Sequence, residues 1–159
     1  MQPFVPFLKV VVDRREEAKY RRRAIAHYPA EYLEMLWGRV HGTTVYICVF
    51  VPMEHTGTPD YIQFEEDELD HQGDEAKEER LELLGTIHSH TSEDLSGEPS
   101  ILDIYGSTAA IETVIGICAI EKRESGRMKT LVRYWPRLRE FDVEYRSRSA
   151  KFQQRPQIL

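Results

Sequence analysis

The sequence predicts a single α/β domain whose sheet is rich in antiparallel pairs. The chain of 159 residues has the usual length of one compact domain, so one core carries any function. Its 41% apolar and 30% charged residues exclude a disordered or collagen-like chain. Short runs rich in Val, Ile and aromatic residues alternate with Gly and Pro, and three stretches have the spacing or caps of helices.

The first two elements are predicted to be a strand and a helix. Residues 4–12 form an apolar run that is followed by Asp13, a preferred N-cap residue. Apolar residues then recur at rough three- to four-residue spacing over residues 14–27, and Pro29 ends the pattern. We therefore expect a strand to lead directly into a helix.

The middle of the chain predicts a hairpin and a second helix. The apolar stretch 30–38 runs through a turn at Gly42 into a β-rich run over residues 43–51, which favours an antiparallel pair. Residues 64–84 combine many acids with spaced Leu and Ala residues, and Gly85 follows them. We expect a helix there.

The second half predicts four more strands and a third helix. Apolar residues 83–87 form a short strand, a polar loop follows it, and Ser100 is placed to cap a helix. Two β-rich runs, 111–120 and 129–135, are joined by a turn at Ser125-Gly126. The alternating run 141–145 predicts an edge strand.

Composition excludes several classes of protein. The longest apolar runs, 45–52 and 114–120, are far shorter than the ~20 residues of a membrane-spanning helix. The N-terminus lacks the pattern of a secretory signal, so we expect a cytoplasmic protein without a membrane partner. Cys48 and Cys118 both lie in apolar runs, which indicates buried thiols rather than a disulfide framework.

Charge is distributed unevenly along the chain. The segment from Glu54 to Asp103 holds 16 acidic and two basic residues, a balance of −14, while the rest of the chain carries +8. The basic residues near the N-terminus share a helix-like stretch with Glu16 and Glu17 and lack interleaved aromatic residues. We therefore expect no nucleic-acid partner. The acidic segment is compatible with a solvated helix or with a docking surface for a basic protein.

Two histidines are candidate metal ligands. His88 and His90 are two residues apart, so on an extended segment both imidazoles point to the same side and can bind one metal ion. Asp103, three residues after Ser100, is placed to turn back toward that strand end. Two histidines, one carboxylate and a water form the ligand set of a catalytic zinc ion. The same residues are also compatible with metal-free histidines, a plain N-cap and a first-turn acid.

These motifs resemble those of the JAB/MPN (JAMM) metalloprotease family. The resemblance rests on His88-Ser89-His90, on Ser100-Ile101-Leu102-Asp103 and on the upstream stretch from Pro29 to Gly38, and it spans roughly residues 5–134. It implies a three-layer α/β/α fold around a mixed, curved sheet like that of cytidine deaminases. The single domain would cover residues 1–146, with a flexible tail over 147–159.

The resemblance also implies a role for each matching residue. His88, His90 and Asp103 correspond to the ligands of one Zn²⁺ ion. Glu31 corresponds to the general base, which the family carries on a helix near its N-terminus, and Ser100 to the side chain that supports the oxyanion.

The sequence departs from the family pattern at three places. Nine residues separate His90 from Ser100 where seven are usual, so the loop is two residues longer. Thr91 replaces a proline, and Glu34 stands where an inner glycine is common. Glu31 is preferred as the base because it lies seven positions before Gly38, and Glu34 is the alternative.

The implied activity is zinc-dependent hydrolysis of the peptide or isopeptide bond after the C-terminal tail of ubiquitin or a ubiquitin-like modifier. Segment 54–74 lies where the family inserts its substrate-contacting element. The compact chain resembles stand-alone prokaryotic members. A catalytically silent scaffold that binds partner proteins, and a zinc amidase acting on a small molecule, are the alternatives.

Overall fold

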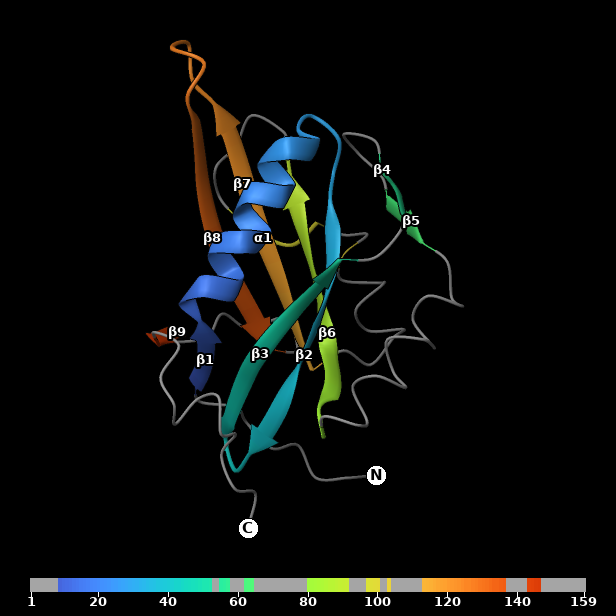
Figure 1. Cartoon of the computed structure of the whole chain (residues 1–159), viewed down its shortest axis with the longest axis vertical. Helices are drawn as coiled ribbons and strands as arrows, with labels where there is room; N and C mark the ends of the chain where they lie inside the picture. Colours follow the sequence, from blue (N-terminus) through green and yellow to red (C-terminus); the bar gives the residue numbers. More distant parts are fainter. Residues whose placement is uncertain are drawn as a thin grey trace.

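The structure is a computed structural model that describes residues 9–52, 55–57, 62–64, 80–91, 97–100, 103, 113–136 and 143–146. These residues form one long helix and nine strands (Figure 1). In chain order they are β1 (Lys9–Asp13), α1 (Arg14–His27), β2 (Leu33–His41), β3 (Thr44–Pro52), β4 (His55–Gly57), β5 (Ile62–Phe64), β6 (Glu82–His90), β7 (Val114–Lys122), β8 (Met128–Pro136) and β9 (Val143–Arg146).

Seven of the strands form one curved, mixed sheet with the order β8-β7-β6-β2-β3-β1-β9 (Figure 1). The pairs β2–β3, β2–β6 and β7–β8 are antiparallel. The pairs β1–β3, β1–β9 and β6–β7 are parallel. The α/β fold class with a mixed, curved sheet is therefore confirmed. The predicted predominance of antiparallel pairs is not observed, because only half of the pairings are antiparallel. Strands β4 and β5 form a separate antiparallel pair.

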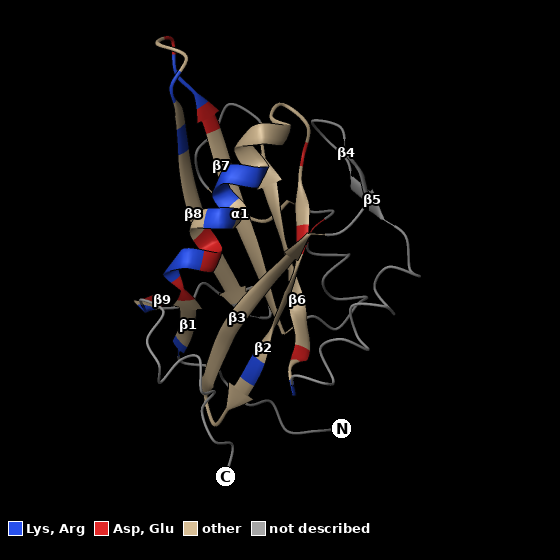
Figure 2. Ribbon diagram, viewed as in Figure 1, with Lys and Arg blue, Asp and Glu red and all other residues tan. Residues whose placement is uncertain are grey.

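Helix α1 begins and ends where the sequence indicates. The Oδ1 atom of Asp13 accepts hydrogen bonds from the backbone N–H groups of Arg15 and Glu16 at 2.9 and 3.2 Å, which satisfies two donors of the first turn. The helix ends at His27, two residues before Pro29. It lies across one face of the sheet (Figure 1), and Figure 2 marks the basic and acidic residues along its ribbon.

The main core lies between α1 and the sheet. Tyr20 and Ala24 of the helix pack there against apolar side chains from six strands. Glu17 is also buried, and its Oε2 atom accepts a hydrogen bond of 2.6 Å from the Tyr134 hydroxyl of β8. Its Oε1 atom accepts from the guanidinium of Arg21, so the buried carboxylate is paired. This network fixes the helix on the β8 side of the sheet.

A glycine permits close packing between β2 and β3. The strand pairing is irregular between Trp37 and Gly38. A Cβ atom at Gly38 would lie 1.8 Å from the carbonyl oxygen of Tyr46, so no larger residue fits without moving a backbone. On the other face of β2, Leu33, Met35 and Trp37 form a second, smaller apolar cluster. Strand β2 is thus packed on both faces.

Several sequence predictions are tested by these elements. The hairpin of β2 and β3 and the hairpin of β7 and β8 are confirmed, as is the edge strand β9, which pairs in parallel with β1. The predicted helix over 64–84 is wrong at both ends: Phe64 ends strand β5, and residues 82–84 already belong to β6 because they pair with β2. Most of that helix, the helix after Ser100 and the tail 147–159 lie outside the described residues.

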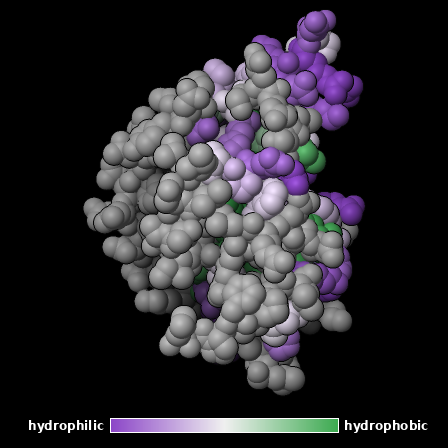
Figure 3. Space-filling model, turned by 180° about the vertical axis from the view of Figure 1, so that it is seen from behind, coloured by the Kyte–Doolittle hydropathy of each residue, from purple (hydrophilic) through white to green (hydrophobic). Residues whose placement is uncertain are grey.

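Neither cysteine forms a disulfide bond; Cys118 is buried and Cys48 half-buried. Among the described residues, no helix is long and apolar enough to span a membrane. The turn between β7 and β8 forms a strongly hydrophilic projection, seen from the opposite side of the molecule in Figure 3.

Candidate metal centre

Strand β6 directs its two histidines away from helix α1. Ile87 belongs to the core that packs against the helix, and side chains alternate along a strand. His88 and His90 therefore point to the opposite face, where His88 lies across from Leu33 of β2. Strands β2 and β7 flank β6, so the backbone of His88 is held by two ladders and that of His90 by the ladder with β7.

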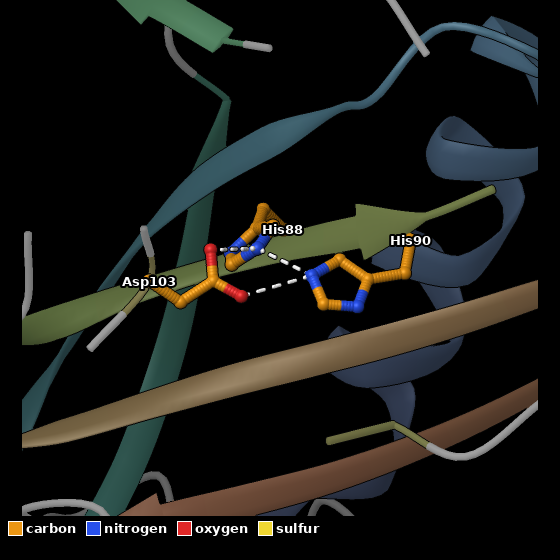
Figure 4. Close-up of side chains that lie close together, drawn as sticks. All are labelled: His88, His90 and Asp103. Carbon is orange, nitrogen blue, oxygen red and sulfur yellow. Dashed lines mark hydrogen bonds and ion pairs between the residues drawn. The ribbon is translucent and has the colours of Figure 1, made fainter. Parts of the chain in front are cut away.

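Asp103 closes the group (Figure 4). Its Oδ1 atom lies 2.9 Å from the Nε2 atom of His88, and its Oδ2 atom lies 3.0 Å from the Nε2 atom of His90. The two Nε2 atoms are themselves 3.0 Å apart. The side chains of all three residues are largely buried, between 11% and 17% exposed, so their polar atoms face one another rather than bulk water. The sequence motifs that predicted a shared site are thus brought together.

The ionised form of the Asp103 side chain is strongly favoured. Burial by itself raises the pKa of this carboxyl, but the hydrogen bonds with His88 and His90 outweigh burial and hold the pKa well below its usual range. The backbone N–H of Ser100 donates to the Oδ2 atom at 2.7 Å and acts in the same direction. The aspartate is therefore ionised at neutral pH, as a metal ligand must be.

Ser100 and Asp103 hold each other in a reciprocal turn. The backbone N–H of Asp103 donates to the Oγ atom of Ser100 at 3.1 Å, while the Ser100 N–H donates to the Asp103 carboxylate. This is the arrangement of a capping box, and it sets the direction of the carboxylate. The Ser100 hydroxyl uses a lone pair in this contact, so its O–H can still donate to another group. Ser100 is exposed, and its role in supporting the oxyanion remains a prediction.

The end of the long loop before Ser100 is anchored to β8. The indole Nε1–H of Trp135 donates to the carbonyl oxygen of Gly97 at 3.0 Å, and the guanidinium of Arg133 lies over the indole ring at 4.7 Å. Gly97 has φ +65°, and a Cβ atom there would come within 3.0 Å of the Arg133 side chain. The two-residue extension of the loop therefore does not prevent Asp103 from reaching the histidines.

Glu31 lies on the segment that enters β2. The family resemblance implied a helix for this residue, but α1 ends at His27 and residues 31 and 32 lead into the strand. Glu31 is half-buried and is not part of the group formed by His88, His90 and Asp103. Its role as a general base remains a prediction.

Glu34 is on the other face of β2. It is fully buried, and both of its oxygens accept hydrogen bonds from the guanidinium of Arg23 in α1, at 2.6 and 2.8 Å. The histidines point away from α1, so Glu34 cannot reach them. This pair removes the alternative base that the sequence had left open.

The three donor groups fit a zinc ion. Zn²⁺ prefers tetrahedral sites with bonds of about 2.0 Å, in which neighbouring ligand atoms are roughly 3.3 Å apart. The observed separations of 2.9 to 3.0 Å are close to that value. The two imidazole nitrogens face each other and the carboxylate. One divalent cation can be bound by all three groups at once.

Fold and site together define a mixed-sheet α/β domain with a His-His-Asp group that could hold a metal ion. No protein-family model and no curated protein matches the sequence. Solved structures do match the fold. Protein DSY2949 from Desulfitobacterium hafniense is 15% identical, with a TM-score of 0.68 over 89% of this chain and 95% of that one. AF2198, a JAB1/MPN domain protein from Archaeoglobus fulgidus, is 16% identical, with a TM-score of 0.50 over 88% and 97%. At these identities the likeness shows a JAB1/MPN-like fold.

Two features of the site had no clear sequence signal. The bond from Trp135 to Gly97 joins residues that are distant in the chain. The pairing of Arg23 with Glu34 depends on how α1 crosses the sheet. The sequence contains one hint of this pairing: Glu34 is a charged residue in a largely apolar strand, and a buried charge must be paired.

Proposed function

We propose that this chain is a zinc-dependent isopeptidase or peptidase that hydrolyses the bond after the C-terminal tail of ubiquitin or a ubiquitin-like modifier. The observation that carries this proposal is the convergence of His88, His90 and Asp103 on a JAB1/MPN-like fold. The cluster supports a single bound cation, and the resemblance in sequence motifs supports its use in peptide hydrolysis.

Each residue has a distinct task in the proposed reaction. A zinc ion, when bound, supplies Lewis-acid polarisation and a water whose pKa is lowered toward ~7. Glu31 accepts a proton from the attacking water and delivers it to the departing amine. The exposed Ser100 hydroxyl donates to the carbonyl oxygen as negative charge develops there, and one such donor is worth roughly 3 to 4 kcal/mol.

The substrate class follows from the family resemblance. An extended tail can bind by adding a strand beside the site, a common mode of peptide recognition. The acidic segment 54–74 suits a modifier with a basic face. Reversing the charges of Glu65, Glu66 and Asp67 should weaken cleavage and reduce its salt dependence, and unchanged cleavage would disprove this role.

The first experiment is the metal content of the purified protein by mass spectrometry. We expect about one zinc ion per chain, lost in His88→Ala and in Asp103→Ala. His41→Ala is the matched control because His41 ends β2 outside the group, and it should keep its zinc. A natural protein that takes up no zinc even when zinc is supplied would contradict the proposal and favour a silent scaffold.

The second experiment separates hydrolysis of modifiers from other zinc chemistry. A panel of ubiquitin and ubiquitin-like fusions is incubated with the zinc-loaded protein, and Glu31→Ala is the catalytic control. Cleavage after the modifier tail that is lost in Glu31→Ala supports the proposal. A zinc-loaded protein that cleaves no fusion but hydrolyses small amides would instead be a small-molecule amidase.

A further inference from the structure

Two hydroxyl groups join the segment that carries Glu31 to the strand that carries the histidines. Ser89 lies between the two histidines on β6, and Thr91 follows the second one. The Ser89 Oγ atom accepts a hydrogen bond of 2.8 Å from the backbone N–H of Tyr32. The Thr91 hydroxyl donates to the carbonyl oxygen of Pro29 at 2.8 Å. Both contacts reach the short connection between α1 and β2.

These bonds occur where the regular ladder between β2 and β6 ends. The described pairing begins at Leu33 opposite His88. One residue before Leu33, the backbone N–H of Ser89 donates to the carbonyl oxygen of Tyr32 at 2.9 Å. The Ser89 Oγ atom in turn accepts a hydrogen bond from the Tyr32 N–H. Extending this register by one more residue brings Glu31 alongside His90. The position of Glu31 relative to the metal group is therefore set by the backbone at Tyr32.

Burial makes the Ser89 contact difficult to replace with water. Ser89 is 0% exposed and Tyr32 4% exposed, so the Tyr32 amide has no solvent partner to exchange for the serine. The Tyr32 carbonyl also accepts a bond of 3.2 Å from the Tyr20 hydroxyl of α1. Thr91 is half-buried and holds the outer end of the same segment, so loss of its hydroxyl is a milder change.

We propose that Ser89 and Thr91 are positioning residues that hold residues 29–32, and with them Glu31, beside the metal-binding strand. Their hydroxyls bond the backbone of Tyr32 and Pro29, and neither residue belongs to the metal group. This inference rests on the proposed hydrolase function. A proline at position 91 would lack the hydroxyl, so the threonine adds a contact to the site that a proline could not make.

The test compares Thr91→Val, which removes the hydroxyl at nearly constant size, with Thr91→Ser, which keeps it. Ser89→Ala is the stronger variant. For Thr91→Val and Ser89→Ala we expect kcat on a cleavable fusion to fall about 10- to 100-fold, with KM nearly unchanged. Zinc content should stay at the natural level because His88, His90 and Asp103 are intact. Thr91→Ser should restore most of the natural kcat.

A second readout does not depend on activity. In cobalt-loaded protein, the NMR pseudocontact shift of the Glu31 amide reports its position relative to the metal. That shift should change in Ser89→Ala and Thr91→Val but not in Thr91→Ser. Amide exchange at Tyr32 should accelerate about tenfold or more in Ser89→Ala.

The outcomes separate this inference from the proposed function. A natural protein that cleaves fusions, with both hydroxyl-free variants equal to it in kcat and in the Glu31 shift, would overturn the positioning role alone. A natural protein that binds no metal and cleaves nothing would overturn the proposed function, and the positioning role with it. A lower kcat accompanied by loss of zinc would also overturn the positioning role, because it would indicate damage to the ligand strand.

Discussion

The buried pair between Arg23 and Glu34 gives a quantitative prediction about stability. Glu34 is 0% exposed and accepts two guanidinium bonds of 2.6 and 2.8 Å, whereas the Arg23 side chain is 32% exposed. Removing one partner of a buried pair typically costs ~3 to 5 kcal/mol because the remaining charge is uncompensated. Since water can approach from the Arg23 side, we expect Arg23→Met to lose about 3 kcal/mol, near the lower limit.

That loss is measurable by urea denaturation and by thermal unfolding. For a chain of this length, 1 kcal/mol corresponds to roughly 2 to 4 °C in Tm, so Arg23→Met should unfold about 6 to 12 °C below the natural protein. Lys19→Met on the same helix is the matched control. Its ion pair with Glu16 is 3.4 Å long and the lysine side chain is 43% exposed, so its loss should cost less than about 0.5 kcal/mol.

The double variant tests the reasoning. If the cost arises from an unpaired charge, Arg23→Met combined with Glu34→Met should recover most of the lost stability, because an apolar pair of similar volume often replaces a buried ion pair without loss. A double variant as unstable as Arg23→Met, or an Arg23→Met loss below about 1 kcal/mol, would refute this explanation. Zinc content should be unchanged in every variant, since the pair lies on the opposite face from the histidines.

Three further predictions concern the metal, the loop and the buried phenols. Zinc at 100 times its Kd should stabilise the natural protein by about 2.7 kcal/mol in thermal unfolding, and an equal gain in Asp103→Ala would contradict the assigned ligand. Trp135→Phe removes the donor to Gly97 and should weaken zinc binding about tenfold in a competition titration with a chelator, whereas unchanged affinity would show that the anchor does not position Asp103. Burial is the first cause that raises the pKa of four tyrosines. The contribution of these neutral phenols to the free energy of unfolding is therefore complete below pH ~10, and it is lost as the pH rises toward their folded-state pKa. Absorbance at 295 nm should show that these four ionise only as the protein unfolds, and their reversible titration near pH 10 in the folded state would refute this. The four are Tyr20, Tyr32, Tyr134 and Tyr145.

Local sequence signals predicted the elements that are stabilised locally. Helix α1 has its predicted bounds because Asp13 caps its first turn and Pro29 follows its last. The approach of His88 and His90 was predictable for a similar reason, since alternation along a strand depends only on spacing. The turn of Ser100 and Asp103 is also a local capping pattern.

Contacts set by tertiary packing were not predictable in the same way. The parallel pairing of β1 with β9 depends on the order of strands in the sheet, which no local pattern contains. Residues 82–84 show a helical composition, but pairing with β2 makes them the start of strand β6. The location of Glu34 likewise depends on the face of β2 that meets α1.

The pairing of β1 with β9 also constrains how the chain folds. Val10 of β1 pairs with Val143 of β9, so forming this contact closes a loop that includes nearly the whole domain. Such long-range contacts carry a large entropy cost and slow the folding of sheet proteins. Among the described strands of the sheet, β9 is the last to leave the ribosome during synthesis, whereas His88, His90 and Asp103 are already present. The metal ligands can therefore assemble on a nascent sheet before edge strand β9 exists.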